Sequence, residues 1–164
     1  MMDFSFLNKR VILILLVAGW CCVIFSFSAE DSEESSWTSG AIISTVCEWI
    51  VPEFGDFQGE QRQEFIDDLQ FAVRKSAHFT AYAILGFLSW FALYGIKKGY
   101  RYACAVGFSF LYACSDEIHQ LFVPGRSGEF RDVLIDTAGA ILGALIGLGF
   151  TALALKINRK KKST

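Results

Sequence analysis

The sequence predicts an all-α membrane protein: a four-transmembrane-helix bundle, with amphipathic helices in the outside segment between the first and second spans. The first observation is composition, because 53% of the 164 residues are hydrophobic and the mean hydropathy is +0.39. A soluble protein of this size would expose much of that apolar surface to water. The second is that charged residues are segregated from long uncharged stretches. Five cysteines in a chain of this length exclude a disulfide scaffold, and the moderate charge excludes disorder.

Four stretches have the length of a membrane span, for which about 20 residues are needed. The expected spans are 11–29, 76–96, 102–122 and 135–155. The third crosses only if it continues through Asp116, Glu117 and Gln120, which places polar groups inside the membrane. The first has a basic start, but it is long for the apolar part of a signal peptide and is followed by more spans. We therefore expect an uncleaved helix.

The lysines and arginines predict the orientation. If the N-terminus is cytoplasmic, ten of the 15 cations lie inside, which favours both termini in the cytoplasm of a multi-pass cell-membrane protein. The inside set is Lys9, Arg10, Lys97, Lys98, Arg101, Lys156, Arg159, Lys160, Lys161 and Lys162, and the outside set is Arg62, Arg74, Lys75, Arg126 and Arg131.

The outside segment, residues 30–75, contains two stretches with apolar residues at helical spacing. One runs from Ile42 to Ile50 and is stopped by Pro52, and the other runs from Glu60 to Arg74. Both are expected to be amphipathic helices that lie on the outer surface or cap the bundle. The alternative is a solvated, partly ordered loop. The acidic run at residues 30–36 is expected to be flexible and hydrated.

Polar residues on three of the expected spans fall at the same depth near the outer surface. An intramembrane carboxylate costs at least ~2.5 kcal/mol, so such groups face the bundle interior and have partners. We therefore expect an outward-opening polar site. Its predicted members are Arg74 and Lys75 just before the second span, His78 and Tyr82 on it, Asp116, Glu117 and Gln120 on the third, Arg126 in the following turn, Asp132 just before the fourth, and Asp136 on it.

Below Asp136 the fourth span continues into a stripe of small residues, Gly139, Gly143 and Gly147. Such a stripe allows close helix contact, either within the bundle or between subunits. Because Asp136 shares this side of the helix, we expect the contact to lie within the bundle.

Two interpretations of the polar site remain open. As a catalytic site, it would pair His78 with Glu117 or Asp116 as acid and base, because a carboxyl group out of water holds its proton more readily. Arg126 would clamp a phosphate or carboxylate group. As a structural feature, it would be a set of buried ion pairs that fix the helix register.

The same site contains possible metal ligands in His78, Asp116, Glu117, Asp132 and Asp136. However, no two histidines are spaced i, i+4, and no His-Glu-x-x-His motif is present. We therefore predict neither a metal nor a cofactor. The basic stretch from Lys156 to Lys162 suits anionic lipid on the cytoplasmic side, and no nucleic-acid partner is implied.

Three blocks of sequence occur in order, and together they resemble a known family. They are Arg74-Lys75-x-x-His78-x-x-x-Tyr82-x-x-Leu85-Gly86, Ser115-Asp116-Glu117-x-x-Gln120-x-Phe122-x-Pro124-Gly125-Arg126, and Asp132-Val133-x-x-Asp136-x-x-Gly139. The family is the VanZ-like family of bacterial membrane proteins, and the resemblance covers roughly residues 70–147. Many relatives carry Asn at the position of Asp136, so this chain adds a carboxylate.

The resemblance implies one VanZ-like membrane domain over residues 1–164. It also implies a link to glycopeptide susceptibility, because the family is named for a protein that confers low-level resistance to teicoplanin. It implies no particular reaction.

Three functions are consistent with these features. The first is a binding module that holds a membrane lipid, a lipid-linked envelope precursor or a glycopeptide antibiotic at the outer leaflet. The second is an intramembrane enzyme that acts on a phosphate, ester or amide of an envelope lipid through Glu117, His78 and Arg126. The third is a small transporter, which the apolar cytoplasmic half disfavours unless the protein oligomerises. The resemblance favours the first.

Overall fold

The computed structural model describes residues 4–162, and of residues 4–7, 32–35, 38 and 39 only the backbone. Within this part of the chain every regular element is a helix, so the predicted all-α class is confirmed. The helices are α1 (Phe4–Ser28), α2 (Ser32–Ile50), the short 3₁₀ helix η1 (Phe54–Asp56), α3 (Glu60–Ala92), α4 (Lys98–Gln120) and α5 (Phe130–Lys162).

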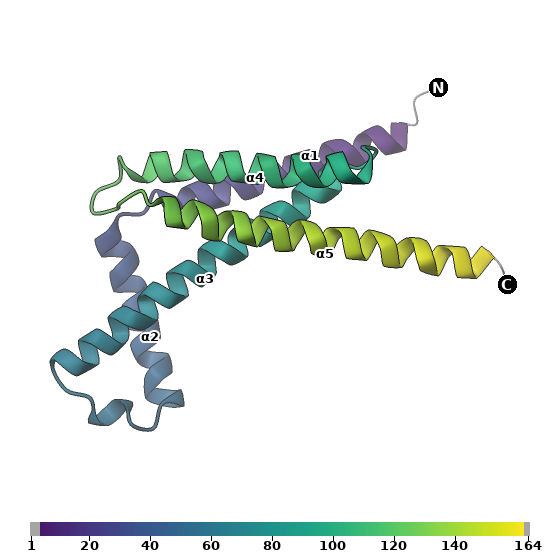
Figure 1. The fold of residues 1–164 in the computed structure, drawn as a ribbon. Coiled ribbons are helices and arrows are strands. Elements are labelled where there is room, and N and C mark those ends of the chain that lie inside the picture. Colours follow the sequence, from purple (N-terminus) through teal and green to yellow (C-terminus); the bar gives the residue numbers. More distant parts are fainter. Residues whose placement is uncertain (1–3, 163–164) are drawn as a thin grey trace.

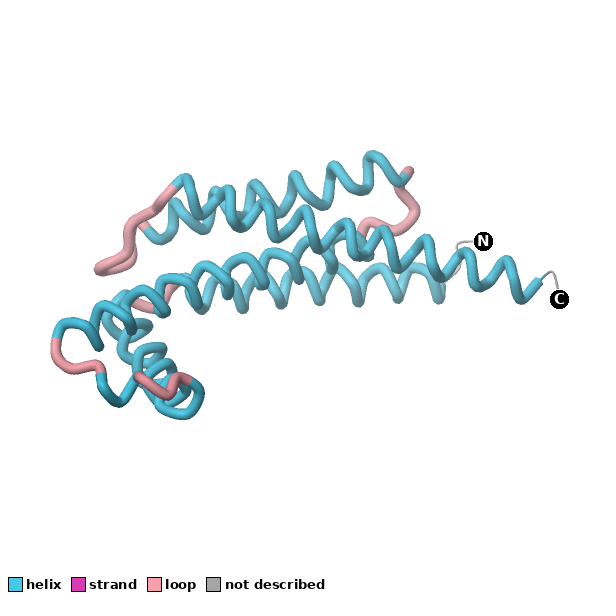
Figure 2. Tube along the Cα trace, turned by 60° about the horizontal axis from the view of Figure 1, so that its bottom comes forward, coloured by secondary structure: helices cyan, strands magenta, loops and turns pink. Residues whose placement is uncertain are grey.

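The long helices form a bundle in which α3 packs most extensively against α5. Helix α4 also packs on α5, and α1 packs on α3, so α3 and α5 form the centre of the bundle (Figure 1). The first turns of α1 and the last turns of α5 lie at the same end of the bundle in both views (Figures 1 and 2). At the opposite end, α2 and the first half of α3 project away from the other helices.

Two of the helices are long and apolar enough to cross a membrane. They are α1, over Asn8–Ser28 with a mean hydropathy of 2.6, and α5, over Phe130–Lys162 with a mean hydropathy of 2.1. Large apolar side chains of α1 are exposed, such as Leu15 at 64%. Soluble monomeric proteins rarely expose a continuous apolar surface of this kind to water. These two helices support a membrane protein. Helices α3 and α4 cover the other expected spans, but within the described residues neither contains a stretch as apolar as those of α1 and α5.

The seam between α3 and α5 is a contact between helix backbones. A Cβ atom added at Gly143 would overlap the carbonyl oxygen of Ala83, and one at Gly139 would overlap that of Phe79. Gly86 on α3 is equally close to the backbone of Ala140 on α5. The glycine stripe therefore packs within the bundle, as predicted, and it brings the polar residues of the two helices together.

Helix α1 is joined to the bundle by side-chain hydrogen bonds as well as by apolar packing. Ile24 is buried in a cluster with Tyr82 and Leu85 of α3. The hydrogen bonds run from Trp20 Nε1 to the carbonyl oxygen of Ala81 at 2.8 Å, from the Tyr112 hydroxyl to that of Cys21 at 2.6 Å, and from Gln120 Nε2 to Ser28 Oγ at 2.8 Å. Loss of α1 would expose this cluster.

The outside segment differs from the prediction in two respects. Helix α2 begins at Ser32, inside the run that was expected to be flexible, and continues through the predicted helix to Ile50. The stretch from Glu60 to Arg74 is not a separate helix, because it is continuous with the second expected span in the 33-residue helix α3. No glycine or proline interrupts the sequence before Gly86, so nothing breaks the helix at the expected boundary.

The apolar sides of α2 and the first half of α3 pack on each other. Ile43, Cys47 and Phe54 are buried there against Phe65, Ile66 and Leu69 of α3. Arg62 of α3 also forms an ion pair with Glu48 of α2, with 2.7 Å between Nη2 and Oε1. The outside segment is thus an ordered pair of helices.

Candidate functional site

The turn between α4 and α5 positions Arg126. The amide of Arg126 donates to the carbonyl oxygen of Val123 at 3.2 Å, and Gly125 has a φ of 71°, as a type II turn requires. The turn brings the guanidinium group to the end of α1, where Nε donates to the carbonyl oxygen of Glu30 at 3.1 Å and Nη2 to that of Phe27 at 3.5 Å. Arg126 therefore satisfies carbonyl groups that the helix end leaves unpaired.

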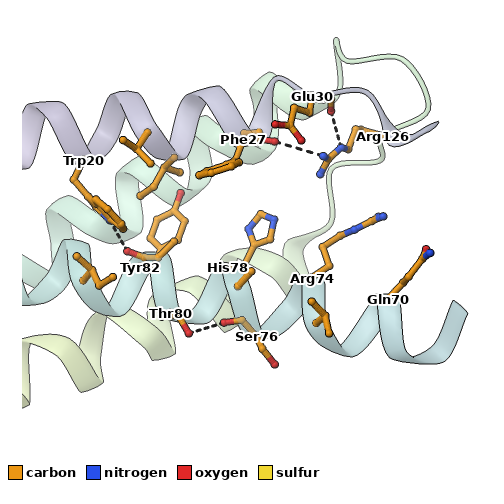
Figure 3. Close-up of a pocket in the computed structure, with 17 residues that line it drawn as sticks. Trp20, Phe27, Glu30, Gln70, Arg74, Ser76, His78, Thr80, Tyr82 and Arg126 are labelled. Carbon is orange, nitrogen blue, oxygen red and sulfur yellow. Dashed lines mark hydrogen bonds between the residues drawn. The ribbon is translucent and has the colours of Figure 1, made fainter. Parts of the chain in front are cut away.

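A cavity of about 580 Å³ lies between α1 and α3, and we call it the α1–α3 groove (Figure 3). His78 and Tyr82 of α3 line it. Arg74, Arg126 and Glu30 lie at the end nearest α2, which we call the outer end. Its apolar wall is formed mainly by Trp20, Val23, Ile24 and Phe27 of α1 and by Val73, Ala77, Ala81 and Ile84 of α3. The groove therefore has an outer part in which two arginines outnumber one glutamate, and an apolar inner part.

The outer part of the groove is held in place by α2. Nη2 of Arg74 donates to Ser36 Oγ at 3.2 Å, and Gln70 Nε2 donates to the carbonyl oxygen of the same serine at 3.1 Å. This contact engages one nitrogen of Arg74, whereas a guanidinium group carries five N–H donors. Arg74 is therefore both positioned by the protein and able to donate to an anionic group in the groove.

Behind His78, two carboxylates from other helices complete a buried cluster. Asp116 of α4 is 3% exposed and Asp136 of α5 is fully buried. One potential ligand atom from each of the three residues lies within 4.8 Å of the other two. Nδ1 of His78 is 3.6 Å from Oδ1 of Asp136, and neither carboxylate accepts a hydrogen bond from the described residues. We call these three residues the buried His–Asp cluster.

Lys75 and Asp132 were also predicted as binding residues, but they form an ion pair with each other. Lys75 Nζ donates to both carboxylate oxygens of Asp132, and its distance to Oδ2 is 2.6 Å. The two side chains are 16% and 10% exposed. The pair joins α3 to the first turn of α5, which is the contact expected of a residue pair that fixes helix register.

Glu117 and Gln120 lie away from the groove lining. Glu117 Oε2 accepts a hydrogen bond from the backbone amide of Glu129 at 2.8 Å, directly before α5 begins, while Gln120 is bonded to Ser28 of α1. Of the predicted acid–base pairs, the structure therefore brings His78 toward Asp116, with Asp136 added, while Glu117 holds the start of α5.

The α1 side of the groove was not anticipated. The first span carries no Asp, Glu, Lys, Arg or His between Arg10 and Glu30, so its charge pattern gives no indication that it lines the site. Trp20, whose indole bonds to α3, was the one available signal, because an indole N–H within a span needs an acceptor.

Comparison with known proteins agrees with the resemblance of the three sequence blocks. A family model described as VanZ/LLP1 matches residues 13–152, a range that includes the groove and the buried His–Asp cluster. No curated protein and no solved structure matches the chain.

Proposed function

The chain belongs to the VanZ/LLP1 family, and from that premise we propose that it binds an anionic, lipid-linked molecule of the bacterial cell envelope in the α1–α3 groove. The observation that carries this proposal is the division of the groove into a cationic outer part, at Arg74 and Arg126, and an apolar inner part. A ligand with a phosphate head and a long hydrocarbon tail is complementary to both parts.

The apolar wall of the groove is open toward the outside of the bundle. Val23 is 39% exposed, Phe27 65% and Ile84 37%, although all three line the cavity. In a membrane this opening faces the acyl chains of the bilayer. A polyprenyl or acyl tail would therefore lie against these residues and continue into the lipid, while its head remains with the arginines.

We also propose the orientation in the membrane that this function requires. Helices α1, α4, α5 and the second half of α3 cross the bilayer, with α2 outside and both termini in the cytoplasm. The distribution of cations supports this arrangement, as does the position of the α1 start and the α5 end at one end of the bundle. The groove then opens at the outer leaflet, where envelope precursors are displayed.

Reporter fusions test this orientation. Alkaline phosphatase is active only outside the cytoplasm, so a fusion after Gly55 is expected to be active and a fusion after Gly99 inactive. Green fluorescent protein, which is used as the reciprocal reporter at the same two sites, should give the opposite pattern. Phosphatase activity at Gly99 would contradict the proposal, because it would mean that α3 does not cross.

The proposed consequence of binding is reduced susceptibility to teicoplanin. A protein that binds a lipid-linked precursor at the outer leaflet reduces the access of a glycopeptide to that precursor. This part of the proposal rests on the family. The groove supplies the physical means, because it would hold the precursor at the membrane surface.

Binding of undecaprenyl phosphate by the full chain in detergent tests the ligand class. Arg74→Gln is expected to weaken binding about tenfold, the equivalent of about 1.4 kcal/mol for one charge-assisted hydrogen bond. Undecaprenol, which has the same tail and no phosphate, should bind weakly to both proteins. Arg131→Gln is the matched control, because Arg131 is exposed and is not among the groove residues.

Susceptibility to teicoplanin and vancomycin in a sensitive Gram-positive host provides the second readout. The wild type and Arg131→Gln are expected to protect selectively against teicoplanin, and Arg74→Gln to lose protection at matched membrane levels. Equal binding of undecaprenyl phosphate and undecaprenol would count against a phosphate-headed ligand. Equal protection by Arg74→Gln would count against the link between the groove and susceptibility.

A second candidate function, enzymatic turnover of the bound lipid, is favoured by one observation. His78 lines the groove, and its Nδ1 is 3.6 Å from Asp136. A histidine oriented by a buried carboxylate is a common arrangement for a general base. Mass spectrometry of the same binding mixtures distinguishes the two functions, because an enzyme converts the lipid over time and a binding module leaves it unchanged.

A further inference from the structure

The buried His–Asp cluster points to a ligand that the described residues do not supply. Asp116 and Asp136 come from different helices, are almost completely buried, and accept no hydrogen bond from the described residues. Two such carboxylates side by side repel each other and have lost their hydration. His78 lies 3.6 Å from Asp136, but one imidazole carries at most one positive charge, so the pair needs a further positive partner. We propose that His78, Asp116 and Asp136 bind a divalent metal ion.

The charged side chains around the cluster do not provide this partner. Lys75, one turn before His78 on α3, is engaged by Asp132. Arg126 donates to the carbonyl groups at the end of α1, and Arg74 to Ser36 of α2. On α4, Glu117 accepts a hydrogen bond from the start of α5 and His119 stacks on Phe25 of α1, with 4.4 Å between ring centroids. A bound dication would neutralise the two aspartates in place of these groups.

The geometry of the three residues suits an ion of the first transition row. Ligand atoms on opposite sides of such an ion, each about 2.1 Å away, are about 4.2 Å apart. The three ligand atoms lie within 4.8 Å of one another, so a small inward rotation of the side chains closes the site. One imidazole and two carboxylates favour Zn²⁺ or Mn²⁺ over Mg²⁺ and Ca²⁺, which prefer oxygen ligands alone.

Three protein ligands leave at least one coordination position open. His78 and Tyr82 both line the α1–α3 groove, so the open position is adjacent to the groove. Tyr82 is fully buried and its hydroxyl makes no hydrogen bond to the described residues, so it is available to a group bound there. This step rests on the proposed function, whereas metal binding by the three residues does not.

The spacing of residues along the sequence does not predict this metal site. Each of α3, α4 and α5 contributes a single ligand, so no short motif brings two of them together in the sequence. The close contact of α3 and α5 at their glycines is what allows His78 and Asp136 to meet.

Metal analysis of the full chain, purified in detergent without chelators, is the direct test. We expect close to one Zn²⁺ or Mn²⁺ per chain, and recovery of that content when an EDTA-treated sample is exposed to either ion. In titrations with Mn²⁺ followed by electron paramagnetic resonance, Asp116→Asn, Asp136→Asn and His78→Gln should each bind roughly 100-fold more weakly. Asp68→Asn, on the exposed side of α3, is the matched control and should bind as the wild type does.

Thermal unfolding separates loss of the ion from loss of the fold. Added Mn²⁺ should raise the melting temperature of the wild type and of Asp68→Asn, and leave that of Asp136→Asn unchanged. In EDTA, Asp136→Asn should melt no lower than the wild type, because it removes one of two facing charges. A folded wild type that contains no metal and shows no shift with either ion would overturn the proposal, as would unchanged Mn²⁺ affinity in the three variants. Lipid is absent from these measurements, so their failure is distinct from failure of the groove.

Discussion

Gly143→Ala is expected to lower the free energy of unfolding by at least about 2 kcal/mol, although it adds only one methyl group. The added carbon would overlap the carbonyl oxygen of Ala83, which is part of the α3 backbone and cannot rotate away. The helices must separate, and the displacement is transmitted to Gly139 and Gly86, which sit against the partner backbone in the same way. The buried His–Asp cluster above this seam would open as well.

Gly149→Ala is the matched control for this prediction. It lies on the same helix, and a Cβ atom there meets nothing within 4 Å. Alanine at that position should leave the protein as stable as the wild type or slightly more stable, since alanine favours helix over glycine. The measurement is the thermal midpoint of each protein in detergent, together with the fraction that elutes as one species. Equal midpoints for the two alanine variants would mean that α3 and α5 do not pack as described.

Much of the fold could be predicted because hydrophobic patterning is a local property. Residues 11–29 and 135–155 fall almost entirely within α1 and α5, and the helix that ends before Pro52 ends at Ile50. The glycine stripe predicted a close helix contact because small residues allow the backbones of two helices to approach each other. The position of Arg126 beside the polar region followed from the short turn that precedes α5.

The remaining features depend on which residues happen to meet in space. From the sequence, Lys75, Asp132 and Glu117 could equally well have contacted a ligand. Only the distances in the structure show that Lys75 pairs with Asp132 and that Glu117 accepts a hydrogen bond from the amide of Glu129. Arg101 is a similar case, because it was counted only as a cytoplasmic cation. Its side chain is buried over the ring of Trp90, and Nε donates to the carbonyl oxygen of that residue at 2.5 Å.

The predicted site residues therefore fall into two groups, which the sequence pattern does not separate. Arg74, His78, Tyr82 and Arg126 line the groove, and Asp116 and Asp136 lie behind it. Lys75, Asp132, Glu117 and Gln120 join helices to one another. The second group makes contacts that a ligand would have to break, which is the reason for treating it as support for the first.

The Lys75–Asp132 pair allows this division to be tested, because removal of one partner leaves the other charge buried. Lys75→Met is expected to lower the free energy of unfolding by about 3 kcal/mol, since unpaired buried charges typically cost 3–5 kcal/mol. Asp132→Asn alone should cost less, because the longer lysine side chain can reach water. The double variant should be more stable than the sum of the two single effects predicts, by about 1–2 kcal/mol.

The double variant then separates support from ligand binding. If the pair only joins α3 to α5, a folded Lys75→Met/Asp132→Asn protein should bind undecaprenyl phosphate as the wild type does, while Arg74→Gln remains about tenfold weaker. Lys75 lies next to Arg74 in the sequence, yet it points toward α5 and is not among the groove residues, which is why the two should differ. Loss of lipid binding in a double variant that melts like the wild type would instead place Lys75 at the ligand, and the ion pair would then describe only the unliganded state of the site.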